Sequence, residues 1–166
     1  AYSFCLHYTD SARVSQAEIK YSGSNALIPR SCPYRLGHAS GIMLCMDISA
    51  RITDVLTRMA AACARTGRPP DTVKLLLVTK TVPAEIIRTA LASGQIRLGE
   101  NKVQELRDKQ PLLADIPAEW HFIGHLQTNK AKDLVGRVAL IHSVDRLELA
   151  QKLQQRLEAA DLHQDI

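Results

Sequence analysis

The stretch Lys74-Leu-Leu-Leu-Val-Thr-Lys-Thr-Val-Pro83 decides the fold, because four consecutive apolar residues are followed by a polar exit. An apolar run without alternation is typical of a strand that is buried on both faces, as in a parallel sheet covered by helices. Pro83 cannot continue a central strand, but it suits the first turn of a helix. Lys80 is therefore predicted to lie at the carboxyl end of a buried strand, where α/β proteins place their ligands.

Lys80 has two interpretations at this position. A lysine at a strand exit acts as a Schiff-base nucleophile where its surroundings favour the neutral amine over the ammonium. The simpler interpretation is a lysine that marks the point where the strand enters water. The position alone does not decide between them, so the rest of the chain has to.

The composition is that of an ordinary globular domain, with 166 residues of which 46% are hydrophobic and 23% are charged. No stretch reaches the ~20 apolar residues of a membrane span, and the amino end lacks the pattern of a secretory signal. The formal net charge is +4, but residues 43–166 hold seventeen basic and fifteen acidic residues that alternate along the chain. A nucleic-acid-binding domain usually concentrates its basic residues on one stripe, so this class is not favoured.

The four cysteines all lie in the first 63 residues and show no C-x-x-C spacing. They predict neither a zinc site nor a disulfide framework, and free thiols in a reducing cytoplasm are the default.

Residues 1–42 differ in composition from the remainder of the chain. They hold all four tyrosines, begin with Ala1, and show no sustained period of 3.6 or 2 residues. The composition changes around Met43 and Met46. We therefore expect residues 1–45 to be a disordered or non-native N-terminal extension, and residues 46–166 to be the folded unit.

From Asp47 onward, helical and strand patterns alternate. The expected helices run from Asp47 or Ser49 to Gly67, over 83–93, from a capping box of Asn101 and Gln104 to about Pro111, over 131–135, and from a second box of Asp145 and Glu148 to about Ala160. The expected strands are 74–79, 96–98, 119–124 and 138–144. The chain stops where a fifth strand should begin.

This succession predicts an α/β fold with parallel strands, for which two architectures are compatible. One is an open doubly wound sheet, and the other is a (β/α)8 TIM barrel of which only about the first four β/α units are present. The absence of a G-x-G-x-x-G motif and of a P-loop weakens the mononucleotide-binding forms of the open sheet. Polar residues at every strand exit favour the barrel.

The strand exits carry the candidate site residues, which are Lys80, Thr81, Glu100, Asn101, Lys102, His125, Gln127, Asn129, Lys130, His142, Ser143 and Asp145. Several have a structural alternative. Asn101 and Asp145 suit helix caps, and His142 suits a hydrogen-bonded core histidine. His121 and His125 lack a third ligand at a suitable spacing for zinc, and no metal site is predicted. Ser143 lacks the glycines of a nucleophile elbow.

Four motifs then bring in a known family. They are Leu-Leu-Val-Thr-Lys-Thr (76–81), Leu-Gly-Glu-Asn-Lys-Val-Gln-Glu-Leu (98–106), Trp-His-Phe-Ile-Gly-His-Leu-Gln-Thr-Asn-Lys (120–130) and Ile-His-Ser-Val-Asp (141–145). In this order and at these spacings they closely resemble the pyridoxal phosphate homeostasis protein family (YggS/PROSC-type proteins). The resemblance covers about residues 46–166.

The resemblance implies a TIM barrel of the alanine racemase N-terminal-domain type, with pyridoxal 5'-phosphate (PLP) held as a Schiff base on Lys80. Asn101 matches a residue that lines the cofactor pocket, and His142 and Ser143 match positions of the pocket wall. It also implies a non-catalytic, cytoplasmic protein of vitamin B6 and amino-acid homeostasis, with no catalytic residue and no metal. Its expected partner is PLP, with no nucleic acid and no membrane, and the complete protein is expected to be a monomer.

The chain departs from the family's pattern in several places. Thr79, Leu98 and Lys102 replace a usual serine, aromatic residue and tyrosine. The family's phosphate-binding loops and the arginine for the pyridine nitrogen come from late strands that this chain lacks.

Three other functions remain compatible with the sequence. They are a PLP-dependent amino-acid racemase or decarboxylase of the same barrel type, a class I aldolase-like Schiff-base enzyme without PLP, and a weak nucleic-acid binder using Lys102, Lys109, Lys130 and Lys132.

Overall fold

The structure is a computed structural model that describes the backbone of residues 4–10, 13–19 and 39–166, and the side chains from Ile48 onward. A six-stranded sheet organises it, with the strand order β2-β1-β3-β4-β5-β6. The strands β3 (Leu75–Val78), β4 (Arg97–Glu100), β5 (Glu119–Phe122) and β6 (Leu140–Ile141) pair in parallel. The described chain is therefore an α/β structure with a parallel sheet at its centre, as the apolar run in 74–83 predicted.

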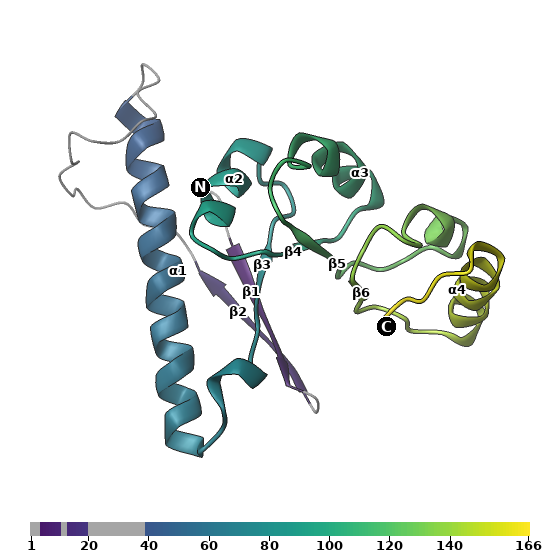
Figure 1. Cartoon of the computed structure of the whole chain (residues 1–166), viewed down its shortest axis with the longest axis horizontal. Coiled ribbons are helices and arrows are strands. Elements are labelled where there is room, and N and C mark those ends of the chain that lie inside the picture. The colour runs from purple at the N-terminus through teal and green to yellow at the C-terminus, as the bar shows by residue number, and fades with distance from the viewer. Residues whose placement is uncertain (1–3, 11–12, 20–38) are drawn as a thin grey trace.

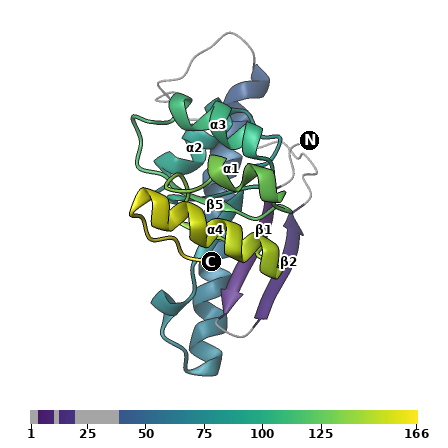
Figure 2. The same ribbon diagram turned by 90° about the vertical axis from the view of Figure 1, so that its right-hand side faces the viewer.

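A helix follows each parallel strand, so that strand and helix alternate from Leu75 to the end. In chain order the helices are α1 (Ala39–Thr66), the 3-10 turn η1 (Pro70–Thr72), α2 (Ala84–Ala92), α3 (Val103–Leu112), the 3-10 helix η2 (Thr128–Asp133) and α4 (Leu147–Ala160). Figure 1 shows α1 at one end of the molecule and α2, α3 and α4 following in turn towards the other. Figure 2 looks from the α4 end, with α4 in front of β5 and α1 behind it.

The hydrophobic core lies between the sheet and these helices. From the strands it takes residues of one parity, including Leu77, Leu98 and Phe122, all 2% exposed or less. From the helices it takes fully buried side chains such as Ile87 and Leu106. Successive strand residues point to opposite faces, so the next residue of each strand lies on the face turned away from these helices.

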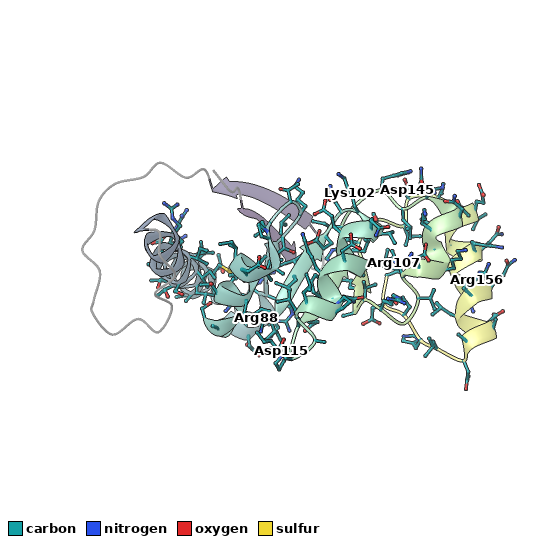
Figure 3. The ribbon with its side chains drawn as sticks, turned by 90° about the horizontal axis from the view of Figure 1, so that it is seen from above. Arg88, Lys102, Arg107, Asp115, Asp145 and Arg156 are labelled. Atoms are coloured by element: carbon teal, nitrogen blue, oxygen red, sulfur yellow. The ribbon has the colours of Figure 1, made fainter. Side chains whose placement is uncertain are left out.

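A glycine and an ion pair help to set the helices on the sheet. Gly94 ends the α2 segment with φ of 87°, a conformation that glycine adopts without strain. The Arg88 guanidinium on α2 donates to the Asp115 carboxylate just after α3, at 2.5 and 3.0 Å, and holds the pKa of that carboxyl below its usual value. Figure 3 labels both side chains, which link the α2 and α3 units.

The parallel succession continues past α4. The N–H of Ile141 donates to the carbonyl of Asp165 at 3.1 Å, and Leu140 pairs with Asp165 in the parallel sense. This is the position at which the sequence predicted the start of a fifth parallel strand.

The amino-terminal region contributes two strands to the sheet. Within residues 1–45, expected to be disordered or non-native, β1 (Phe4–Asp10) and β2 (Arg13–Ile19) form an antiparallel hairpin, and β1 pairs antiparallel with β3. β3 is the outermost of the parallel strands, and β1 pairs with the N–H and C=O groups on its other side. The division of the chain at residue 46 stays a prediction.

Helix starts were predicted less well than strands. The first helix begins at Ala39 and not at Asp47 or Ser49, because an uninterrupted helical backbone passes through both expected caps. Over 131–135 the structure has the end of the 3-10 helix η2 in place of the expected α-helix. In the described part of the chain, none of the helices combines the length and apolar character needed to cross a membrane.

Candidate functional site

The register of the parallel strands defines rows of residues that lie side by side across the sheet. Val78 pairs with Gly99, Gly99 pairs with His121, and His121 pairs with Leu140. This row is the last complete one inside the strands, and its members share the face turned away from the core helices.

Three of the four residues that were predicted to hold or line the cofactor, Lys80, Asn101 and His142, fall on the next row of the same face. Two residues beyond the paired row come Lys80, Asn101, Ile123 and His142, one from each strand exit. Parallel hydrogen bonding continues at this level, because the Ile123 N–H donates to the Glu100 carbonyl at 2.9 Å. Lys80, Asn101 and His142 are thus brought to one edge of the sheet, at the carboxyl ends of β3, β4 and β6.

Lys80 itself is exposed, between a buried residue and a turn. Thr79 before it is fully buried, and Thr81 after it has φ of 61°, in the left-handed region. This region is unfavourable for a β-branched residue, so the chain turns sharply and under strain directly after Lys80.

A second lysine, Lys109 on α3, lies buried beneath this turn. It is 9% exposed, and its Nζ donates to the Thr79 carbonyl at 2.8 Å, to Glu100 Oε1 at 2.8 Å and to Glu105 Oε2 at 3.0 Å. From the sequence alone, Lys109 was expected only as a surface cation for nucleic acid. The i, i+4 spacing of Glu105 and Lys109 on one helix was the signal for part of this network.

The two carboxylates differ in their electrostatics. Burial raises the pKa of Glu100, which is fully buried, although the hydrogen bonds from Lys109 and the Thr79 hydroxyl oppose the shift. Burial would also raise the pKa of Glu105, but the Thr81 N–H and the Lys109 ammonium outweigh it and hold that pKa below its usual value. Glu105 is therefore the carboxylate that stays ionised most readily.

Asn101 does not form the capping box that the sequence predicted. The residue before α3 is Lys102, which has no side-chain cap, and Gln104 bonds within the helix to Asp108 at 2.8 Å. Asn101 is instead half-buried, and its Oδ1 is shielded from solvent without a hydrogen-bond partner in the described part of the chain. A buried acceptor without a partner is costly, and it marks a place where a ligand donor fits.

Gly124 fixes the position of Asn101 and links it to Ser143. A Cβ on Gly124 would lie 2.1 Å from the carbonyl oxygen of Asn101, so the two backbones approach as closely as only glycine permits. The Gly124 carbonyl in turn accepts a hydrogen bond from the Ser143 hydroxyl. Ser143, which was predicted as a pocket-wall residue, lies next to the row. Its hydroxyl already donates this hydrogen bond to the Gly124 carbonyl.

The second box, Asp145 with Glu148, is not formed either. The residue before α4 is Arg146, without a side-chain cap bond. Asp145 accepts from Arg146 at 2.5 Å and lies 3.2 Å from His125. Its contacts with Arg146 and His125 place it in the exit loop and away from the helix N–H groups.

His142 takes part in a series of polar contacts on the face of the sheet that is turned away from the core helices. Arg97 Nε lies 3.2 Å from Glu119 Oε1, which is 3.1 Å from His121 Nε2, and His121 Nδ1 is 3.0 Å from His142 Nε2. Burial lowers the pKa of His121, so its ring is neutral near pH 7. With its Nε2–H directed to Glu119, the neutral ring accepts at Nδ1, and His142 donates from Nε2.

A cavity of about 280 Å³ opens between the start of α3 and η2. Its charged lining residues include Lys102, Arg107 and Lys130. Figure 3 labels Lys102, which directly precedes α3, and Arg107, which lies on α3. Its lining also includes the core residue Phe122 and the predicted exit residues Asn101, His125 and Gln127, whereas Lys80 and His142 are not among its lining residues. Across the described side chains, no group of three or more His, Cys, Asp or Glu residues could hold a metal ion.

The fold and the row define a class: an α/β protein whose parallel strands are followed, at one edge of the sheet, by a lysine, an asparagine and a histidine. Comparison with known proteins narrows the class. The chain is 47% identical over 121 residues to the pyridoxal phosphate homeostasis protein of Aquifex aeolicus, covering 73% of this chain and 53% of that protein. It is 45% identical over 112 residues to that of Pseudomonas aeruginosa, covering 68% and 49% respectively.

Solved structures agree with these relatives. PipY of Synechococcus elongatus, in a structure with PLP bound, is 36% identical with a TM-score of 0.57, covering 69% of this chain and 50% of that one. A protein of Bifidobacterium adolescentis is 28% identical with a TM-score of 0.64, covering 84% and 56%. No model of a known protein family matches the chain.

The chain belongs to the pyridoxal phosphate homeostasis protein family. It spans about half the length of the curated relatives that it matches.

Proposed function

We propose that this chain is the part of a PLP-binding protein that supplies the Schiff-base lysine, Lys80. The observation that carries the proposal is that Lys80, Asn101 and His142 follow the carboxyl ends of β3, β4 and β6, at one edge of the parallel sheet. Relatives named for PLP homeostasis and the PLP-bound PipY structure support it. The cellular role that we propose is buffering of PLP, and with it vitamin B6 and amino-acid balance.

The residues present fit part of the cofactor. The exposed Lys80 amine suits the aldehyde, and the partnerless Asn101 Oδ1 suits a donor of the ligand. Lys80 would hold the cofactor through its side-chain amine, and PLP would supply an aldehyde that condenses with a primary amine with loss of one water. His142 and Ser143 contribute a wall whose polar groups are already directed by His121 and Gly124.

We propose that binding is not accompanied by turnover. Racemases and decarboxylases of amino acids need acid and base groups against the substrate α-carbon. His121, the buried histidine of this face, has one ring nitrogen directed to Glu119 and the other to His142. It is therefore poorly placed to exchange protons with a substrate.

We propose that the complete protein is a (β/α)8 barrel in the cytoplasm, monomeric and without a metal, nucleic-acid or membrane partner. Four consecutive parallel strand–helix units and the pairing of Asp165 beyond β6 support a sheet that continues. In such a barrel the row of Lys80 faces the interior, where the strands' carboxyl ends converge.

An absorbance titration with PLP tests the proposal. Addition of PLP to the chain, and to a chimera extended by the remaining part of the Aquifex relative, is expected to give a saturable Schiff-base band. Lys80→Ala should abolish this band, while the matched exposed variant Lys102→Ala should keep it. A band of equal intensity in Lys80→Ala would contradict the assignment. Turnover of amino acids by the saturated chimera would instead support the racemase or decarboxylase alternative.

A further inference from the structure

We propose that Glu100, Glu105 and Lys109 form a clamp that positions Lys80 by fixing the backbone on both sides of it. The inference deepens the proposed function and rests on it. None of the three clamp residues lies on the row of Lys80, so each would act through the chain that carries the lysine and without touching the cofactor.

On the amino side of Lys80, every polar atom of Thr79 is held. Its carbonyl accepts from Lys109 Nζ at 2.8 Å, and its hydroxyl donates to Glu100 Oε1 at 2.7 Å. Its N–H donates to the Gly99 carbonyl at 2.9 Å. Thr79 and Glu100 are both fully buried, so these bonds are not in competition with water.

On the carboxyl side, Glu105 holds the strained turn. Its Oε2 accepts from the Thr81 N–H at 2.7 Å and from Lys109 Nζ at 3.0 Å. A threonine at φ of 61° persists only when its surroundings hold it there, and this charge-assisted bond does so. The turn sets the direction in which the chain, and with it the Lys80 Cα–Cβ bond, leaves β3.

Fixing that bond is useful because a lysine side chain is long and flexible. Its reach to a fixed aldehyde improves when fewer orientations of the stem are populated, which is preorganisation. The clamp also separates the two lysines chemically. The Lys109 ammonium is buried with three acceptors around it, whereas Lys80 is exposed. An aldehyde should therefore react at Lys80 and not at Lys109.

Neighbouring substitutions on α3 test the clamp. Glu105→Ala removes the acceptor of the Thr81 N–H, and Gln104→Ala is the matched control, because Gln104 bonds only along the helix to Asp108. The readouts are amide hydrogen exchange at Thr81 and the rate at which borohydride traps PLP on Lys80, both measured in the parent chain, its chimera and the variants. Glu105→Gln keeps an amide oxygen for the Thr81 N–H and serves as the conservative rescue.

In Glu105→Ala we expect Thr81 exchange to accelerate and trapping on Lys80 to slow, each by about tenfold, the scale of one hydrogen bond to a charged group. Gln104→Ala should change neither, and Glu105→Gln should recover most of the trapping rate. Faster exchange with unchanged trapping would overturn the positioning role. Exchange of the Thr81 amide in the parent at the rate of an unprotected amide would overturn the clamp without any variant. A parent chimera that PLP does not label at Lys80 would instead overturn the proposed function, and the inference with it.

Discussion

Replacing Gly124 by alanine is expected to separate the exits of β4 and β5, because no space exists for the added carbon. The new Cβ would lie 2.1 Å from the Asn101 carbonyl oxygen and 2.7 Å from its carbonyl carbon and Cα. All three are backbone atoms, so no side chain can rotate away. Reaching ordinary contact, which begins at 3.4 Å, requires a backbone shift of about 1.3 Å.

The magnitude follows from what that shift breaks. Overpacking of a close-packed site costs about 1–3 kcal/mol. Loss of the 2.9 Å bond between the Ile123 N–H and the Glu100 carbonyl adds about 1 kcal/mol. We therefore expect Gly124→Ala to lower the free energy of unfolding by about 3 kcal/mol, a large part of the roughly 5–15 kcal/mol of a typical domain.

Urea denaturation followed by circular dichroism measures this loss, and Gly99→Ala is the matched control. A Cβ on Gly99 would meet Ile123 Cδ1 at 3.3 Å, the end of a flexible side chain that yields by a few tenths of an ångström. Its cost is expected to stay below about 1 kcal/mol, because Gly→Ala also lowers the entropy of the unfolded chain. Equal urea midpoints for the two variants would refute the close approach of Gly124 to Asn101.

Two further predictions concern the buried charges. Lys109→Met should lower the free energy of unfolding by about 3–5 kcal/mol, because the buried Glu100 then lacks its cation, and the double variant with Glu100→Gln should recover part of that loss. Urea midpoints measure both effects. A double variant less stable than the single variant would contradict the pairing of Lys109 with Glu100. His121 has a lowered pKa, so below about pH 6.5 the unfolded chain takes up a proton that the folded chain does not, and stability should fall as pH falls, by at most roughly 1.4 kcal/mol per pH unit. His121→Gln should flatten the dependence of stability on pH, measured by urea titrations at successive pH values. His163→Gln, at an exposed histidine, should keep this dependence. An unchanged slope of stability against pH in His121→Gln would show that another group is responsible.

The strands were predictable because their signal is local. Leu75–Val78 form an apolar run that only a doubly buried strand accommodates, and all four are 5% exposed or less. Knowing that a strand ends before Lys80 was enough to place this lysine at the carboxyl edge. The spacing of the later strands then brought Asn101 and His142 to the same edge.

The helix caps and the clamp could not be predicted, because they depend on contacts between distant segments. Asn101 has the right chemistry for a helix cap, but its backbone lies against Gly124, twenty-three residues later. The residue at the cap position of α3 is Lys102 instead, without a side-chain cap hydrogen bond. Lys109 has the sequence context of a surface lysine. Its burial follows from the packing of α3 over the exits of β3 and β4. There the Glu100 carboxylate and the Thr79 carbonyl accept hydrogen bonds from its Nζ.

Peptide mapping after borohydride reduction tests the central claim most directly. PLP is added to the chain and to its chimera, the imine is reduced to a stable secondary amine, and every lysine-containing peptide is weighed. The account predicts a pyridoxyl group on Lys80, with Lys109 unlabelled in the same sample. Label scattered over the exposed lysines, with no preference for Lys80, would contradict it.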